Sequence, residues 1–530
     1  MKTVNLEVSC KTDAKQEQTI NHSSRLRVDT EPFDKLRMPR RVPSKVEARG
    51  RTNKPSTSLR LDGEHSRTIN PSTPLRVNGE PFDKLRMPRR VPSKVEARCR
   101  TVKFFTLGCK VNQYDTQAMR ERFIRAGFRD IKNGKKSDVY VINTCTVTQG
   151  ADRESRYLIR YVRRNNPQAV IAVTGCYAQS DSDEIKKIPG VTCVVKNEEK
   201  NRIIELLSKE KHYKEISGYN GLGKISNFPG HTRAFLKIQD GCGNFCSYCK
   251  VPLVRGSPRS KPLKNIIQEA EQLVRKGFKE IVLCGICLGQ YGRDLDSRIN
   301  LVNVLEALEN LTGLLRIRLS SIEAGDVSDQ LINMISRSNP SCRPKGKLCR
   351  HLHIPIQSGD DGILEKMNRN YCRKDYLKLI RKIKKYIPGV AITTDVLVGF
   401  PGESDKAFEN SVNLVKKISP LKVHIFPFSP REGTLAFSLK DKISPEIIKK
   451  RMLSLNNVAE PLSLSYRKKF LNKNMDVLIE QRNKKSRLFW SGHTDNYIEV
   501  IVKSSKYLKN QMLSLRLDKI FEDYVIADFS

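Results

Sequence analysis

The chain has 530 residues, of which 38% are hydrophobic, and it carries 97 Lys and Arg against 57 Asp and Glu. This length predicts two to four domains, and the net charge of +40 favours a polyanionic partner over an acidic one. No stretch approaches the ~18 apolar residues of a membrane span, and Met1–Glu7 lacks the apolar core of a secretory leader. We therefore expect a cytoplasmic protein with no membrane contact, whose 14 cysteines serve metal binding more than disulfides.

Residues 1–100 differ from the rest of the chain. The segment Glu31–Arg49 recurs unchanged at Glu80–Arg98. A structural repeat drifts in sequence and needs about three stacked units, whereas unchanged, proline-containing copies with little apolar periodicity predict a disordered extension. A basic arm that tethers RNA is the alternative. The extension holds 23 basic and 12 acidic side chains, so +29 of the net charge lies in the remaining residues.

Strands alternate with helices from residue 101 to about residue 210, which predicts an α/β domain with a parallel sheet. The apolar runs that predict its buried strands are Val102–Leu107, Val139–Ile142 and Val170–Thr174. Cys109, Cys145 and Cys176 each follow one of these strands, at the sheet edge where ligands gather. One such cysteine could be a core residue, but three at equivalent positions predict a site for an iron–sulfur cluster with three thiolate ligands.

A polar segment at 211–228 predicts a linker, and the following strand, Thr232–Ile238, leads into a cysteine-rich loop. Cys242, Cys246 and Cys249 have C-x3-C-x2-C spacing. Three thiolates this close in sequence can hold three irons of a 4Fe-4S cluster and leave the fourth iron open. A zinc site is the alternative, but neither a second C-x2-C pair nor a histidine follows within the usual distance.

Residues 229–465 repeat the strand and helix pattern, which predicts a partial (β/α)6 barrel whose site lies at the C-terminal ends of the strands. The further strands are expected at Glu280–Cys284, Arg316–Ser320, His351–Pro355, Ala391–Leu397 and Val423–Phe426. Cys284 and Cys287 form a C-x2-C pair without a second pair nearby, so we expect structural cysteines. His351 and His353 point to the same face of their strand, as hydrogen-bonded interior imidazoles more than metal ligands.

Residues 466–530 turn to short alternating strands, which predict a small β-barrel of the OB type. Cations that meet phosphates are interleaved with aromatic rings that stack on bases, a combination typical of RNA binding. A basic barrel without a nucleic-acid ligand is the alternative. The predicted RNA contacts are Arg482, Lys484, Lys485, Arg487, Trp490 and Tyr497.

The Cys242–Cys249 loop, with Tyr248 before its last cysteine, resembles the radical S-adenosylmethionine (SAM) superfamily. With the earlier cysteines, the chain from Thr101 resembles the methylthiotransferases of that superfamily, which combine an N-terminal cluster-binding domain, a SAM-cluster barrel and a C-terminal TRAM barrel. The segment Gly108–Asn112, Gly-Cys-Lys-Val-Asn, is similar to the threonylcarbamoyladenosine branch. The isopentenyladenosine branch more often has Gly-Cys-Gln-Met-Asn there, and the ribosomal-protein branch Gly-Cys-Pro-Lys-Asn.

The resemblance implies two 4Fe-4S clusters and SAM as cofactors. One cluster would be held by Cys109, Cys145 and Cys176, and the other, at the catalytic centre, by the three cysteines of the loop. The resemblance also places SAM at the mouth of the barrel, where the residues predicted to contact it are Tyr248, Gly285, Gln357, Ser358 and Gly399.

The implied reaction is methylthiolation of C2 of N6-threonylcarbamoyladenosine at position 37 of tRNA, next to the anticodon. Its partners would be the anticodon stem-loop of tRNA, an electron donor and a sulfur donor. The alternatives are a methylthiotransferase acting on isopentenyladenosine or on a ribosomal protein, and an RNA-binding iron–sulfur protein without catalysis. The first-cysteine segment and the basic charge argue against the ribosomal protein.

Overall fold

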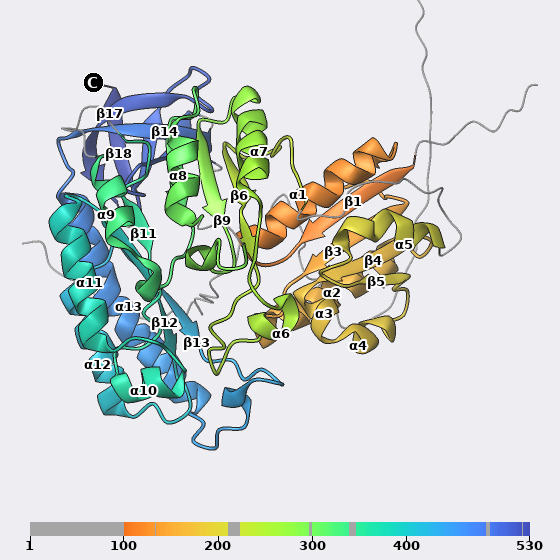
Figure 1. The fold of residues 1–530 in the computed structure, drawn as a ribbon, viewed down its shortest axis with the longest axis horizontal. Helices are drawn as coiled ribbons and strands as arrows, with labels where there is room; N and C mark the ends of the chain where they lie inside the picture. Colours follow the sequence, from red (N-terminus) through yellow and green to blue (C-terminus); the bar gives the residue numbers. More distant parts are fainter. Residues whose placement is uncertain are drawn as a thin grey trace, which may run out of the picture. The chain divides into compact units, whose positions relative to one another are not determined.

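The computed structural model describes residues 100–529 except 133, 210–222, 296–298, 339–345, 484–487 and 522. The predicted N-terminal extension before residue 100 and most of the predicted linker lie outside the described residues. The described chain forms the three regions expected from the sequence: an α/β domain, a partial barrel and a small C-terminal barrel (Figure 1).

The α/β domain holds a five-stranded parallel sheet in the order β2-β1-β3-β4-β5. Its elements are β1 (Thr101–Thr106), α1 (Lys110–Arg125), β2 (Arg129–Asp130), β3 (Val139–Thr144), α2 (Gln149–Asn165), β4 (Val170–Gly175), α3 (Cys176–Ser180), α4 (Ser182–Lys186), β5 (Cys193–Val195) and α5 (Ile203–Lys209). Alternate strand residues face opposite sides: Ile142 packs toward α2, and Val141 packs toward α1 and α5. The register pairs Phe105 with Ile142 and Ile142 with Val173, so three strand ends lie side by side.

Six parallel strands form the partial barrel, in the orders β6-β9-β10 and β11-β12-β13. The strands are β6 (Arg233–Lys237), β9 (Glu280–Cys284), β10 (Arg316–Leu319), β11 (His351–His353), β12 (Ala391–Val398) and β13 (Lys422–Pro427). The helices are α6 (Val251–Arg255), α7 (Leu263–Arg275), α8 (Leu301–Glu309), α9 (Asp329–Ser336), α10 (Asp361–Lys366), α11 (Arg373–Tyr386), α12 (Asp405–Ile418) and α13 (Pro445–Lys468). Isolated bridges such as Ser321 to His353 link the two groups, which confirms the predicted (β/α)6 arrangement.

The strands of the barrel separate an apolar outer face from a polar inner face. On β12, Ile392 and Val396 pack in the core with residues of α11 and α12, while Thr393 and Asp395 alternate with them and point inward. We call the space on the inner side of the strands the lumen. A short pair, β7 (Gln239–Asp240) and β8 (Arg259–Ser260), brackets the cysteine-rich loop at the end of β6.

The C-terminal barrel is closed, in the order β14-β15-β16-β18-β17. Its strands are β14 (Asn474–Arg482), β15 (Phe489–Thr494), β16 (Glu499–Lys503), β17 (Met512–Ile520) and β18 (Val525–Phe529). Four of them are predicted by the apolar runs Met475–Ile479, Tyr497–Val502, Met512–Arg516 and Tyr524–Ala527. Strand β15 is missed, because Ser491 and Gly492 interrupt its apolar pattern. Trp490 of this strand is nevertheless part of the barrel core.

The C-terminal barrel packs on the N-terminal ends of the partial barrel's strands. Arg318 donates to the backbone oxygens of Thr494 and Asp495, and Arg233 forms an ion pair with Glu480 at 3.0 Å. Glu280, which is fully buried, accepts from Arg318 at 2.7 Å. This contact closes the end of the lumen opposite to the cysteine-rich loop.

Buried ion pairs fasten α1 to β6 and to the cysteine-rich loop. Asp115 of α1 accepts from Lys200 at 2.9 Å and from Lys237 of β6. Arg255 lies within 3.5 Å of Asp115 and donates to Asp240 at 2.9 Å. Burial raises the pKa of Asp115, but Lys200, Lys237 and Arg255 outweigh it and hold that pKa well below its ordinary value.

No helix in the described part of the chain is both long enough and apolar enough to cross a membrane.

We expect Asp115→Asn to lower the free energy of unfolding by about 3–5 kcal/mol, because it leaves three buried cations with one carboxylate fewer. The measurement is chemical denaturation of the metal-free protein followed by circular dichroism. Asp183→Asn is the matched control, since Asp183 is exposed and pairs only with Lys186 on the same helix. Equal unfolding midpoints for the two variants would contradict this role of Asp115.

Candidate active site

The first cysteine triad lies at the edge of the α/β sheet. Cys109 directly precedes α1, Cys145 follows β3, and Cys176 is the first residue of α3. Because the parallel strands β1, β3 and β4 are neighbours, their carboxyl ends bring the three residues together. Burial, followed by the charges of Cys176 and Cys109, raises the pKa of the Cys145 thiol to about 12. The three sulfurs therefore share one electrostatic environment.

Gly108 makes this packing possible. Its φ is +94°, and a Cβ there would lie 2.9 Å from the sulfur of Cys145. Only glycine adopts this conformation without strain while leaving room for the neighbouring thiol. The turn between β1 and α1 is thus shaped around the cysteine of the next strand.

The second cysteine triad lies on the loop between β7 and α6. The loop is held by backbone hydrogen bonds from Cys249 to Cys246 at 3.0 Å and from Cys242 to Gly256 at 3.1 Å. Gly241 has a φ of +74°, and a Cβ there would lie 2.0 Å from the Ser257 oxygen. These constraints fold the loop so that its three cysteines influence one another electrostatically.

The thiols of this loop have different acidities. A hydrogen bond from the Cys287 thiol lowers the pKa of Cys242 to about 7, although burial raises it. Burial raises the pKa of Cys249 to about 12 and also raises that of Cys246. Because thiolates are the ligands of iron, binding of a cluster would release protons from Cys246 and Cys249 at neutral pH.

Arginines approach both triads. Nε of Arg255 donates to Sγ of Cys176 at 3.4 Å, and Arg369 donates to Sγ of Cys246 at 3.3 Å. Arg369 also pairs with Glu323, beside a cavity of about 220 Å³ that Cys246 and Asn244 help to line. Sequence reasoning missed both arginines and Glu323, because no local spacing connects residues that lie so far apart in the chain.

The donor sets fit a cluster better than a single ion. All six cysteines are free thiols. Within the described residues, neither triad has all three of its sulfurs within 4.8 Å of one another, whereas the ligand atoms of His353, Asp395 and His424 do lie that close together. A cubane carries its three thiolates on three different irons, so it needs sulfurs that are spread around it. Cys284 is buried in the barrel wall, and Cys287 touches Cys242.

The residues predicted to contact SAM occupy several loops at the C-terminal strand ends. Gly285 follows β9, Gly399 follows β12, and Tyr248 packs edge-on against Phe400. Gln357 has a φ of 62°. Ser358 is fully buried, and its hydroxyl meets that of Ser411 at 3.4 Å. Their role as SAM contacts stays a prediction.

The predicted RNA contacts are scattered. Lys484, Lys485 and Arg487 lie outside the described residues. Trp490 is 1% exposed, with the Arg482 guanidinium 4.9 Å from its ring centroid. Tyr497 stacks on His351 of β11 at 4.4 Å between centroids. Tyr507, by contrast, is 66% exposed and packs edge-on against Trp490. The assignment of these residues to RNA binding stays a prediction.

Comparison with known proteins identifies two family matches. Residues 101–196 match the family described as Uncharacterized protein family UPF0004, and residues 236–415 match the radical SAM superfamily.

Among curated proteins, the chain is 38% identical to the threonylcarbamoyladenosine tRNA methylthiotransferase MtaB of Bacillus subtilis, over 81% of this chain and 96% of that protein. It is 37% identical to the protein of the same name from Thermotoga maritima, over 80% and 96%. It is 32% identical to the tRNA-2-methylthio-N(6)-dimethylallyladenosine synthase of Clostridium tetani, over 74% and 87%.

We expect the double variant Cys284→Ser, Cys287→Ser to retain the iron and sulfide content of the wild-type protein, because neither cysteine belongs to a triad. The variants Cys145→Ser and Cys249→Ser are the matched comparisons, and each should lose about half of the iron, the share of one of two four-iron clusters. The measurement is colorimetric iron and sulfide analysis after anaerobic reconstitution. Iron loss in the double variant would make Cys284 or Cys287 a ligand.

Proposed function

Because the chain belongs to the threonylcarbamoyladenosine tRNA methylthiotransferases of the radical SAM superfamily, we infer that it methylthiolates C2 of N6-threonylcarbamoyladenosine at position 37 of tRNA. The structural observation that carries this inference is the pair of cysteine triads joined by Arg255, which ends the helix that follows the loop of one triad and donates to a sulfur of the other. An enzyme with one cluster, or an RNA-binding protein without catalysis, does not need two neighbouring cysteine triads.

The chain's own residues prepare two sites with separate tasks. Cys242, Cys246 and Cys249 would hold the cluster whose open iron chelates SAM, and Cys109, Cys145 and Cys176 would hold the other. When bound, the clusters supply the electron that cleaves SAM and the place where sulfur is methylated and transferred to carbon. Overall, a C–H bond of the adenine is replaced by a C–S bond that carries the methyl group.

Two arginine side chains beside the triads stabilise negative charge on cysteine sulfurs. Arg255 and Arg369 each contact a cysteine sulfur, so they stabilise the thiolate form that iron requires. Glu323 holds the Arg369 guanidinium in place. The two arginines thus favour loss of the proton from Cys176 and Cys246 when a cluster binds.

Charge and exposed rings support tRNA as the substrate. The net charge of +40 suits a phosphate backbone. Arg153, Arg160 and Tyr157 are exposed on α2, a helix that begins just after the loop of Cys145. The other proposed partners are an electron donor and a sulfur donor. A tRNA substrate also supports a cytoplasmic location, which we propose.

Mass spectrometry of tRNA nucleosides from cells with and without this gene tests the proposal. Loss of 2-methylthio-N6-threonylcarbamoyladenosine, with accumulation of the form that lacks the methylthio group, is the expected result. Loss of the isopentenyl counterpart instead would assign the chain to that alternative substrate. No change in any methylthio nucleoside would refute the enzyme assignment.

We expect Tyr507→Ala to weaken binding of the anticodon stem-loop by about 1–3 kcal/mol, the usual contribution of an exposed ring that stacks on a base. Tyr386→Ala is the control, because Tyr386 is also exposed but lies at the end of α11. Binding is measured by fluorescence anisotropy at a fixed salt concentration. Equal affinities of both variants would remove Tyr507 from the RNA surface.

A further inference from the structure

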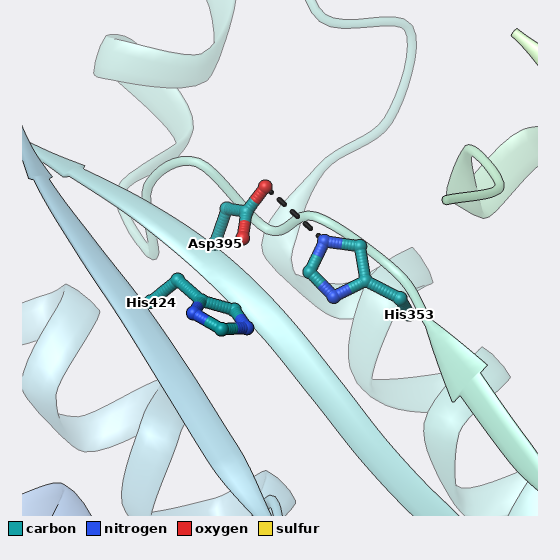
Figure 2. A group of neighbouring side chains, drawn as sticks. All are labelled: His353, Asp395 and His424. Carbon is teal, nitrogen blue, oxygen red and sulfur yellow. Dashed lines mark ion pairs between the residues drawn. The ribbon is translucent and has the colours of Figure 1, made fainter. Parts of the chain in front are cut away.

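Three polar side chains lie together on the inner face of the barrel, and none of them has a role in binding the two clusters. They are His353 of β11, Asp395 of β12 and His424 of β13, which we call the lumen cluster (Figure 2). The strand register pairs His353 with Thr393 and Asp395 with His424, so the three side chains lie within 4.8 Å of one another at their nitrogen and oxygen atoms.

Internal hydrogen bonds orient part of the lumen cluster. Nε2 of His353 lies 3.2 Å from the Asp395 carboxylate, and its Nδ1 lies 2.9 Å from the Thr393 hydroxyl. His424 faces the same space from the neighbouring strand (Figure 2). Burial lowers the pKa of His424 to about 4. The charge of Asp395 acts against burial, and those of His353, Lys422 and Lys110, in decreasing order, act with it. At neutral pH His424 is therefore an uncharged ring that can donate and accept hydrogen bonds.

The charge of a lysine from the α/β domain acts on the same space. The charge of Lys110 acts on Cys284 of β9, His351 of β11, His424 of β13 and Tyr497 of the C-terminal barrel. Contacts of Asp115 with Lys237 and of Asn112 with Arg255 fasten α1 beside the C-terminal end of β6, so its first residue lies near that end of the lumen, and its charge reaches these groups from there. Within the described residues, the Lys110 side chain has no recorded hydrogen bond or ion pair, and it is exposed.

The position of Lys110 is unfavourable for the helix that carries it. Lys110 is the first residue of α1, which has no acidic residue in its first turn. A cation at a helix N-terminus opposes the helix dipole. A residue that is unfavourable for its own helix, with no acidic neighbour to offset it, is typical of a functional position. Here the helix N-terminus and the ammonium group both attract an anion.

The target nucleoside supplies such an anion. The threonylcarbamoyl group carries a carboxylate, a hydroxyl and a urea, whereas the dimethylallyl group of the related substrate is apolar. Resting on the proposed function, we propose that Lys110 and the lumen cluster form the subsite for the threonylcarbamoyl group, in which Lys110 pairs with the carboxylate and the lumen cluster bonds the hydroxyl and the urea.

This subsite explains discrimination between the two modified adenosines. A site built to hydrogen-bond a polar substituent rejects an analogue that leaves its polar groups unpaired. An apolar substituent would leave the Lys110 ammonium group without a partner. Because Lys110 follows Cys109 directly, one turn supplies both a cysteine of the first triad and the lysine that binds the threonylcarbamoyl group.

Binding of chemically altered stem-loops tests the pairing. The reconstituted full-length protein is titrated, without oxygen, with stem-loops carrying threonylcarbamoyladenosine, its methyl ester or plain adenosine. The wild-type protein should prefer the free carboxylate over the ester by about tenfold to a hundredfold, as for a hydrogen bond to a charged group. Lys110→Gln should bind both equally, and Lys110→Arg should keep the preference. Lys186→Gln, which removes an exposed charge elsewhere in the domain, should behave as wild type.

Three outcomes would overturn the subsite. One is an unchanged preference for the carboxylate in Lys110→Gln. Another is loss of iron in that variant with the preference intact, which would assign Lys110 to the first triad. The third is a divalent ion, additional to cluster iron, that the wild-type protein retains and His424→Asn loses. Turnover separates the two claims, because a wild-type protein that forms no methylthio product refutes the proposed function itself.

Discussion

The arrangement of the active site depends on the buried ion pairs between α1, β6 and the cysteine-rich loop. Two carboxylates, Asp115 and Asp240, meet three cations, Lys200, Lys237 and Arg255. Burying charges is costly unless they are well paired, so this group holds only when all its members are in place. The group therefore has one positive charge in excess. Arg255 interacts with Cys176 and Cys109, whose thiolates can offset that charge.

The net charge of these ion pairs links the packing of the protein to binding of a cluster. The network is fully neutralised when a nearby cysteine is deprotonated, which is the state that iron ligation requires. Arg255 and Asp240 flank the loop of the second triad, whereas Arg255 also contacts the first. A displacement of α1 along β6 would therefore move one triad relative to the other, and transfer between the two sites needs a fixed geometry.

A second charged contact closes the opposite end of the lumen. Glu280, Arg318 and the backbone of β15 fix the C-terminal barrel to the N-terminal ends of the strands. Tyr497, with a φ of 67°, stacks between His351 and His493 there. The substrate must then enter from the side of the cysteine-rich loop, as is usual for barrels whose chemistry occurs at the C-terminal strand ends.

The sequence by itself predicted the two cysteine triads and determined the order of the three regions and all six barrel strands, to within one residue at their starts and two at their ends, because periodicity and ligand spacing are local properties. The (β/α)6 barrel is accordingly confirmed. Strand β15 was missed, since Ser491 and Gly492 interrupt its apolar pattern.

Only the tertiary structure decided which charges meet. Arg255 and Asp115, Arg369 and Cys246, and Cys287 and Cys242 come together across long stretches of chain, and no local pattern encodes such contacts. The same reason explains Trp490, whose neighbourhood in sequence is basic while its ring is buried in the barrel core. The sequence shows which chemical groups are present, but the packing of the folded chain decides which of these groups are in contact.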